Sequence, residues 1–207
     1  MRRLVRSSAI AILPTLICLA ASAQQTGLGI KGGAVAATTR SEVLSTTFIP
    51  GAVLGIYFPW GFAPKMELQP EMLVGTNGAR YIEPDGDRYS IRTTYLHVPL
   101  TLKIYVTNSF NIHAGAQGSR LIGAERISSD EDNVDASDRI NPIDFGLVGG
   151  FGLDMRSGLD LTFRYLYGTR PVFSNDFVLY PRNRSITLTA GYRIIQLRVR
   201  PTARKRH

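Results

Sequence analysis

The segment SITLTAGYRI, residues 185–194, alternates strictly between two kinds of side chain. Its even-numbered positions, from Ile186 to Ile194, are apolar or aromatic. Its odd-numbered positions, from Ser185 to Arg193, are hydroxyl-bearing, glycine or arginine. Successive side chains of a β-strand point to opposite faces of the sheet. The segment therefore predicts a strand with one apolar face and one polar face.

The same alternation recurs along the chain, whereas almost no segment has the apolar spacing of an amphipathic helix. Eight runs show it: Gly27–Ala37, Ile49–Phe58, Pro64–Val74, Ile91–Val106, Phe110–Leu121, Pro142–Asp154, Leu159–Gly168 and Ser185–Ile194. The sequence therefore predicts an all-β fold and excludes a helical membrane protein.

The spacers between these runs alternate in length. Residues 38–48, 75–90, 122–141 and 169–184 are long and polar, and residues 59–63, 107–109 and 155–158 are short. An even number of strands with short turns at one end and long loops at the other is typical of outer-membrane barrels. We predict an eight-stranded antiparallel up-and-down transmembrane β-barrel with short periplasmic turns and long extracellular loops. A secreted soluble β-sandwich is the alternative fold.

The first 23 residues have the three parts of a secretory signal peptide. A basic start, MRRLVR, precedes an apolar stretch that Pro14 interrupts, and Ala21-Ser22-Ala23 forms a cleavage pattern. The single cysteine, Cys18, lies inside this segment, so the mature chain would hold no disulfide and no thiolate metal site. We divide the chain into a signal peptide at 1–23, a barrel at 24–195 and a basic tail at 196–207.

The net charge of +8 comes from the two ends of the chain. Of the 24 basic residues, three lie in the predicted signal peptide and five lie in residues 198–207, which leaves 16 against 16 acidic residues. The predicted barrel is therefore neutral, and the high pI does not indicate nucleic-acid binding.

The faces assigned to the lumen carry charges of both signs. Eight strands enclose a space that side chains can fill, so charges buried there must pair or hydrogen-bond with one another. We predict a lumen plugged by a polar network of Lys31, Glu67, Glu71, His97, Lys103, His113, Asp144, Asp160, Arg164 and Arg193. Asp154 also falls on this face. The alternative is that Asp154 and Asp160, beside a short turn, are solvated at the rim.

Several aromatic residues lie near the predicted strand ends. Tyr165 and Tyr167 approach one end, and Tyr57, Phe58 and Trp60 flank a short turn. We interpret these rings as residues of the membrane interface.

The segment Tyr95-Leu96-His97-Val98-Pro99-Leu100, continuing to Lys103 and Tyr105, resembles a stretch of the porin-family outer-membrane β-barrel domain of Gram-negative bacteria. Other segments agree in order and spacing: Gly29–Gly33, Leu68–Leu73, Gly146–Gly152, Phe163–Tyr165 and Leu188–Arg193. The resemblance covers residues 24–195. It implies an eight-stranded barrel in the outer membrane, and the family label is not evidence of a conducting channel.

Two features depart from that family. His97 stands where the family often has an acid, which changes the expected pairing near Lys103. The family's last strand usually ends in a C-terminal aromatic residue, whereas this chain continues past Ile194 to His207.

The sequence contains no catalytic motif of the H-E-x-x-H or G-x-S-x-G type. A lipid-modifying enzyme could use His97 or His113 beside a carboxylate such as Glu67 as a general base. No serine is recognisably spaced with either histidine, so we expect hydrogen-bonded lumen histidines and no catalytic, cofactor-binding or metal-binding residues.

Two of the long spacers have unusual compositions. Residues 130–138 gather five acids but lack the glycine and terminal glutamate of a calcium loop, so we expect a solvated acidic loop. Residues 171–180 are rich in apolar side chains, which indicates either a contact surface or an extension of the flanking strands.

These observations predict an integral outer-membrane protein with a structural or surface-binding role in the cell envelope. The alternatives are a narrow channel for small solutes, a lipid-modifying enzyme and a soluble periplasmic protein. The expected partners are outer-membrane lipid, lipopolysaccharide and the outer-membrane assembly machinery, with no nucleic acid, and the chain is expected to be a monomer. The basic tail is expected to contact anionic headgroups or cell-wall polymer.

Overall fold

The computed structural model describes residues 25–40, 46–82, 88–128, 134–135, 140–172 and 182–198. The predicted signal peptide, most of the acidic stretch 130–138, most of the apolar stretch 171–180 and the tail beyond Arg198 lie outside the described residues. No helix in the described part of the chain is long and apolar enough to cross a membrane.

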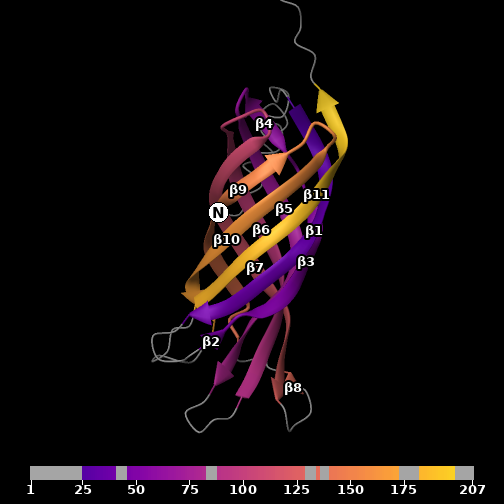
Figure 1. The fold of residues 1–207 in the computed structure, drawn as a ribbon. Coiled ribbons are helices and arrows are strands. Elements are labelled where there is room, and N and C mark those ends of the chain that lie inside the picture. The colour runs from indigo at the N-terminus through magenta and orange to yellow at the C-terminus, as the bar shows by residue number, and fades with distance from the viewer. Residues whose placement is uncertain are drawn as a thin grey trace, which may run out of the picture.

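Eight long antiparallel strands close into a barrel (Figure 1). They are β1 (Gln25–Arg40), β3 (Ile49–Tyr57), β5 (Met66–Ile82), β6 (Arg88–Tyr105), β7 (Phe110–Ser128), β9 (Ile143–Asp154), β10 (Leu159–Pro171) and β11 (Arg182–Arg198). Each pairs with the next in this order, and β11 pairs back with β1. The prediction of an all-β, closed, eight-stranded antiparallel barrel is confirmed.

Three short strands extend this barrel without adding a ninth member to the ring. Strand β2 (Thr46–Thr47) pairs with β5, and β8 (Val134–Asp135) pairs with β7. Strand β4 (Trp60–Ala63) pairs with both β1 and β5, so it continues β3. The expected spacer 59–63 is therefore wrong, because most of it is strand and the turn falls at Pro64–Lys65.

The strands also run further into the expected long loops than the alternation predicts. At the end of the barrel with the long loops, β5 extends to Ile82, β6 begins at Arg88 and β7 extends to Ser128. In Figure 1 the ends of β5, β6 and β7 project with β8 beyond the barrel, at the bottom of the view. A ladder can keep its backbone hydrogen bonds where polar and apolar residues no longer alternate, as in residues 75–82 and 122–128. The alternation therefore stops before the strand does.

The two faces of the sheet differ in chemistry. Large apolar side chains cover the outer face and are exposed, for example Leu54 at 68%, Leu147 at 59% and Leu188 at 59%. The inner face is closed off from solvent and holds many polar side chains, among them Gln69 and Thr101 with no exposed surface. A soluble protein rarely exposes so large an apolar surface.

One aromatic residue does not lie where the sequence suggested. Phe58, Tyr165 and Tyr167 are exposed on the outside, but Tyr57 points into the lumen and is only 1% exposed. Its ring lies over Gly29, where any Cβ would overlap the ring carbons. Strand β3 is apolar on both faces, so its alternation did not reveal which face turns inward.

Candidate functional site in the barrel lumen

The structure places the ten residues of the predicted polar network on the inner face of the barrel. Nine of them are buried, and Arg193 is half-buried near the turn end. They do not form one continuous network. Eight charged side chains, including Asp154, form two separate groups, and the remaining polar residues lie in smaller clusters.

The cross-lumen group consists of Lys31, Glu71, Asp160 and Arg164. The Arg164 guanidinium donates two hydrogen bonds to the Glu71 carboxylate, at 2.9 and 2.8 Å. Lys31 Nζ donates to the same carboxylate at 3.1 Å and lies 3.9 Å from an Asp160 oxygen. Such a two-point contact between a guanidinium and a carboxylate is both stronger and more directional than a single hydrogen bond.

The contact between Arg164 and Glu71 crosses the full width of the barrel. Arg164 lies on β10 and Glu71 on β5. In the ring of eight strands these two are separated by the same number of strands in either direction. An ion pair between opposite walls occupies the axis of the lumen.

The turn-end group consists of Glu67, Lys103, Asp154 and Arg193. Lys103 Nζ lies 3.1 Å from Asp154 and 3.9 Å from Glu67, and Arg193 Nη2 lies 3.3 Å from Glu67. The hydroxyl of Tyr105 lies within hydrogen-bond distance of both Asp154 and Glu67, and it donates its single proton to one of them at a time. The sequence left open whether Asp154 is solvated at the rim. The structure shows it hydrogen-bonded to Lys103 inside the mouth of the barrel.

Each group contains two basic and two acidic side chains, so each is neutral. Moving an unpaired charge from water into a protein interior costs several kcal/mol or more, and a partner with good geometry offsets much of this cost. A neutral group is therefore the arrangement in which four charges can stay buried together. Asp144 is the fifth acid of the lumen, and it accepts a hydrogen bond of 2.7 Å from Asn183.

Among the described residues, neither histidine is hydrogen-bonded to a carboxylate. His97 Nδ1 lies 2.8 Å from Ser119 Oγ, and Gln117 Nε2 lies 3.1 Å from the same nitrogen. His113 Nδ1 lies 3.3 Å from Asn111 Oδ1. Neither histidine pairs with Glu67, which the enzyme alternative had named as the acid.

The sequence reasoning missed Ser119 as the partner of His97, although the sequence contained a signal. The short turn between β6 and β7 sets the register of this hairpin, in which Lys103 faces His113 and His97 faces Ser119. Counting back from the turn by equal steps on both strands finds the pair. Tyr105 was also missed, and it lies on the inward-facing side of β6 together with Lys103.

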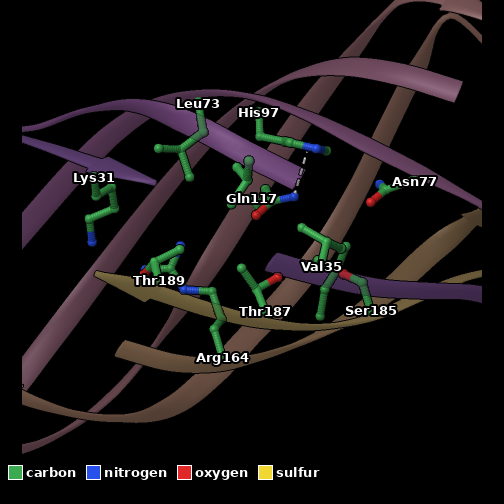
Figure 2. Close-up of a pocket in the computed structure, with 12 residues that line it drawn as sticks. Lys31, Val35, Leu73, Asn77, His97, Gln117, Arg164, Ser185, Thr187 and Thr189 are labelled. Carbon is green, nitrogen blue, oxygen red and sulfur yellow. Dashed lines mark hydrogen bonds between the residues drawn. The ribbon is translucent and has the colours of Figure 1, made fainter. Parts of the chain in front are cut away.

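Two spaces remain inside the barrel. A cavity of about 30 Å³ lies between the cross-lumen group and His97, which is room for about two water molecules at most. In Figure 2 the His97 and Gln117 side chains that line it are joined by a hydrogen bond, and Lys31 and Arg164 are among its other lining residues. A wider space of about 600 Å³ opens at the turn end and is lined by Tyr105, Asp154 and Arg193, among others.

The described residues contain no group of three histidine, cysteine, aspartate or glutamate side chains that could hold a metal ion. What the lumen does contain is paired charge that joins opposite walls. Chemically, this arrangement is suited to filling a barrel and fixing its cross-section.

Comparison with known proteins agrees with this architecture. Residues 22–174 match the family described as "Outer membrane protein beta-barrel domain". The crystal structure of Neisserial surface protein A (NspA) is similar with a TM-score of 0.51 at 14% identity, over 84% of this chain and 99% of that one. Among curated proteins no sequence matches this chain.

Two further solved structures are similar at lower scores. Ail, the attachment invasion locus protein of Yersinia pestis, has a TM-score of 0.47 at 12% identity, over 83% of this chain and 99% of that one. The outer membrane protein OprG from Pseudomonas aeruginosa has a TM-score of 0.46 at 14% identity, over 86% of this chain and 98% of that one.

Proposed function

The chain belongs to the family of outer membrane protein β-barrel domains, and from this premise we propose that it is a structural barrel of the outer membrane whose lumen is closed by its own side chains. The short turns then face the periplasm and the long loops face the exterior, as in other bacterial barrels of this kind. The chain reaches the outer membrane as a secreted precursor, assembles with the help of the barrel-assembly machinery and works as a monomer.

The observation that carries this proposal is the pair of ionic groups in the lumen. The contact between Arg164 and Glu71 spans the barrel, and the turn-end group lies between it and the periplasmic mouth. A hydrated ion would have to displace two neutral groups of paired charges to pass. This supports a structural role over a channel.

A narrow channel is the second candidate, because the space of about 600 Å³ at the turn end is open to solvent. Planar bilayers containing the purified protein separate the two candidates. We expect no steady conductance from the natural chain. Stepwise conductance from the natural chain would refute the closed lumen. The double variant Glu71→Ala with Arg164→Ala, which removes the cross-lumen contact, should conduct more than the natural chain.

The geometry around the histidines argues against the enzyme alternative. The pair of His97 and Ser119 superficially matches a base and a nucleophile, but both side chains are buried in the lumen. The cavity beside them, of about 30 Å³, is too small for a lipid. The replacement His97→Ala should therefore leave the lipid composition of the outer membrane unchanged.

The exposed outer face argues against a soluble periplasmic protein. Apolar side chains such as Leu54 and Leu188 are more than half exposed, and a bilayer would bury them. Fractionation of cells tests this directly. We expect the protein in the outer membrane, extractable only with detergent and migrating differently on a gel before and after heating. Recovery in the periplasm without detergent would refute the proposal.

Protease treatment of intact cells tests the orientation. Cleavage within residues 122–141 is expected, because the proposal places this segment outside the cell. Resistance of intact cells combined with cleavage after opening of the outer membrane would reverse the orientation.

A further inference from the structure

Four arginines lie close together on the outer face of the barrel, at the end with the long loops. They are Arg120 on β7, Arg170 on β10, and Arg182 and Arg184 on β11, and we call them the arginine patch. Three of them are exposed, and Arg184 is half-buried. In Figure 1, β10 ends and β11 begins at the lower left of the barrel, at the end with the long loops.

Strand pairing brings the four arginines together. Arg120 is the direct partner of Ile143 on β9, and the Arg170 guanidinium donates to the carbonyl of that same Ile143 at 3.5 Å. Arg182 is the partner of Pro171, the residue after Arg170. The patch therefore runs continuously across four neighbouring strands.

Two of the arginines are held in place on aromatic rings of the apolar belt. The Arg184 guanidinium carbon lies 3.5 Å from the centre of the Tyr167 ring, and its Nη1 donates to the Gly168 carbonyl at 2.9 Å. The Arg170 guanidinium carbon lies 5.7 Å from the centre of the exposed Phe145 ring. These contacts place charged groups at the edge of the apolar belt, where a bilayer's headgroups would lie.

Within the described part of the protein, no member of the patch forms an ion pair with an acidic side chain. None of the ion pairs among the described residues includes any of its members. On β7, β9, β10 and β11, the one described carboxylate on the outer face is Glu125, whose neighbour in the strand register is Arg92 on β6. The acids Asp144 and Asp160 of these strands point into the lumen. The described part of the chain therefore offers these four positive charges no ion-pair partner at the bilayer edge; the nearest acidic influence on Arg170 is Asp144, which lies inside the lumen.

We propose that the arginine patch binds the phosphate groups of a lipid in the outer leaflet. A phosphate monoester carries about −1.5 to −2 charges near neutral pH, so two such groups balance four arginines. Guanidinium groups bind phosphate through paired hydrogen bonds, and nearby ring surfaces accommodate the lipid's apolar portion. This inference rests on the proposed function, because it requires the loop end of the barrel to lie in the outer leaflet.

The test measures lipid binding by the purified full-length mature protein in detergent micelles, using calorimetry. Three probes are compared: lipid A with its two phosphates, the same lipid with both phosphates removed, and inorganic phosphate. We expect the phosphorylated lipid to bind at least about tenfold more tightly than the dephosphorylated lipid, because charge-assisted hydrogen bonds are lost with the phosphates. Inorganic phosphate in excess should not displace the lipid.

A matched pair of variants locates the site. Arg182→Gln with Arg184→Gln removes two charges from the patch. Arg80→Gln with Arg92→Gln removes two exposed arginines from β5 and β6, outside the patch. The first variant should lose most of the preference for phosphorylated lipid, and the second should keep it. The fourfold change of Arg120, Arg170, Arg182 and Arg184 to glutamine should abolish the preference.

The outcomes separate this inference from the proposed function. Every protein is first checked for heat-modifiable migration, which shows that the barrel is folded. A natural chain that does not form a detergent-soluble barrel would overturn the proposed function and this inference with it. A folded barrel with equal affinity for the two lipids, displacement by inorganic phosphate, or an equal loss in both double variants would overturn this inference alone.

Discussion

The half of the lumen next to the short turns and the half next to the long loops are filled by different chemistry. The turn half holds the cross-lumen and turn-end groups, in which eight charged side chains are joined by ion pairs. The loop half holds the hydrogen bonds around His97, one buried carboxylate, Asp144, bound by Asn183, and an apolar cluster of Val35, Ala37, Val53 and Leu73. Both halves are filled by side chains, although a space at the turn end opens to solvent, and the interactions that fill them differ in kind.

This difference teaches how a narrow barrel can be filled in two ways. Apolar packing is non-directional, and its contribution scales with the area removed from water. An ionic group requires every member, because removing one leaves a buried charge without a partner. We therefore expect the turn half to tolerate substitution less well than the loop half. Four variants test this expectation, from the largest effect to the smallest.

The largest loss is expected from Glu71→Leu in the cross-lumen group. It leaves Arg164 without its carboxylate and Lys31 with only Asp160, and it should lower the free energy of unfolding by about 3–5 kcal/mol. Urea unfolding of the barrel in lipid vesicles measures this. The double variant Glu71→Leu with Arg164→Met restores neutrality and should recover a large part of the loss. A double variant no more stable than the single one would contradict the assignment.

A smaller loss is expected from Leu73→Ala in the loop half. Leu73 is only 4% exposed and belongs to the apolar cluster, so its truncation leaves a cavity and should lower the free energy of unfolding by about 2–3 kcal/mol. Val74→Ala is the control, since Val74 is the next residue and faces outward at 47% exposure. A loss from Leu73→Ala that exceeds that from Glu71→Leu would reverse the comparison between the two halves.

Gly191→Ala tests whether the turn half has room for a side chain at position 191. Gly191 lies between Lys31 and Asp160 in the strand register, and a Cβ there would overlap the Asp160 carboxylate. The displaced carboxylate moves away from Lys31, so we expect a loss of about 1–2 kcal/mol in the same unfolding assay. In the control Gly118→Ala, the added Cβ would lie 3.6 Å from Phe145, an ordinary contact. Equal stability of the two variants would argue against a role for Gly191.

The smallest change is expected from Ser119→Ala. It removes one hydrogen bond to His97 while Gln117 keeps its own, so the free energy of unfolding should fall by about 1 kcal/mol. The ring signals of His97 in a nuclear magnetic resonance spectrum should shift at the same time. Ser157→Ala, in the exposed turn between β9 and β10, is the control and should change neither quantity. Unchanged His97 signals in Ser119→Ala would contradict the contact.

The strand faces could be predicted from the sequence because a barrel has one apolar and one polar side. Alternation alone assigned Glu71 and Arg164 to the same inner face. It could not pair them, because their contact depends on which strands stand opposite after the ring closes. It also failed at Tyr57, where both faces of the strand are apolar, and at the strand ends next to the long loops, where polar and apolar residues no longer alternate.

The contact between Arg164 and Glu71 also bears on the order in which the barrel is built. The two residues are 93 positions apart in the chain, and contacts between distant segments form late in folding because a long loop must close first. During synthesis and insertion Glu71 precedes its guanidinium partner by several strands. Strands β1 to β9 supply two basic and three acidic members of the cross-lumen and turn-end groups, β10 adds one of each, and β11 adds Arg193. The eight charges therefore balance only when the last strand is in place. A barrel that lacks β11 carries one acid in excess, which disfavours its persistence and couples completion of the chain to stability in the membrane.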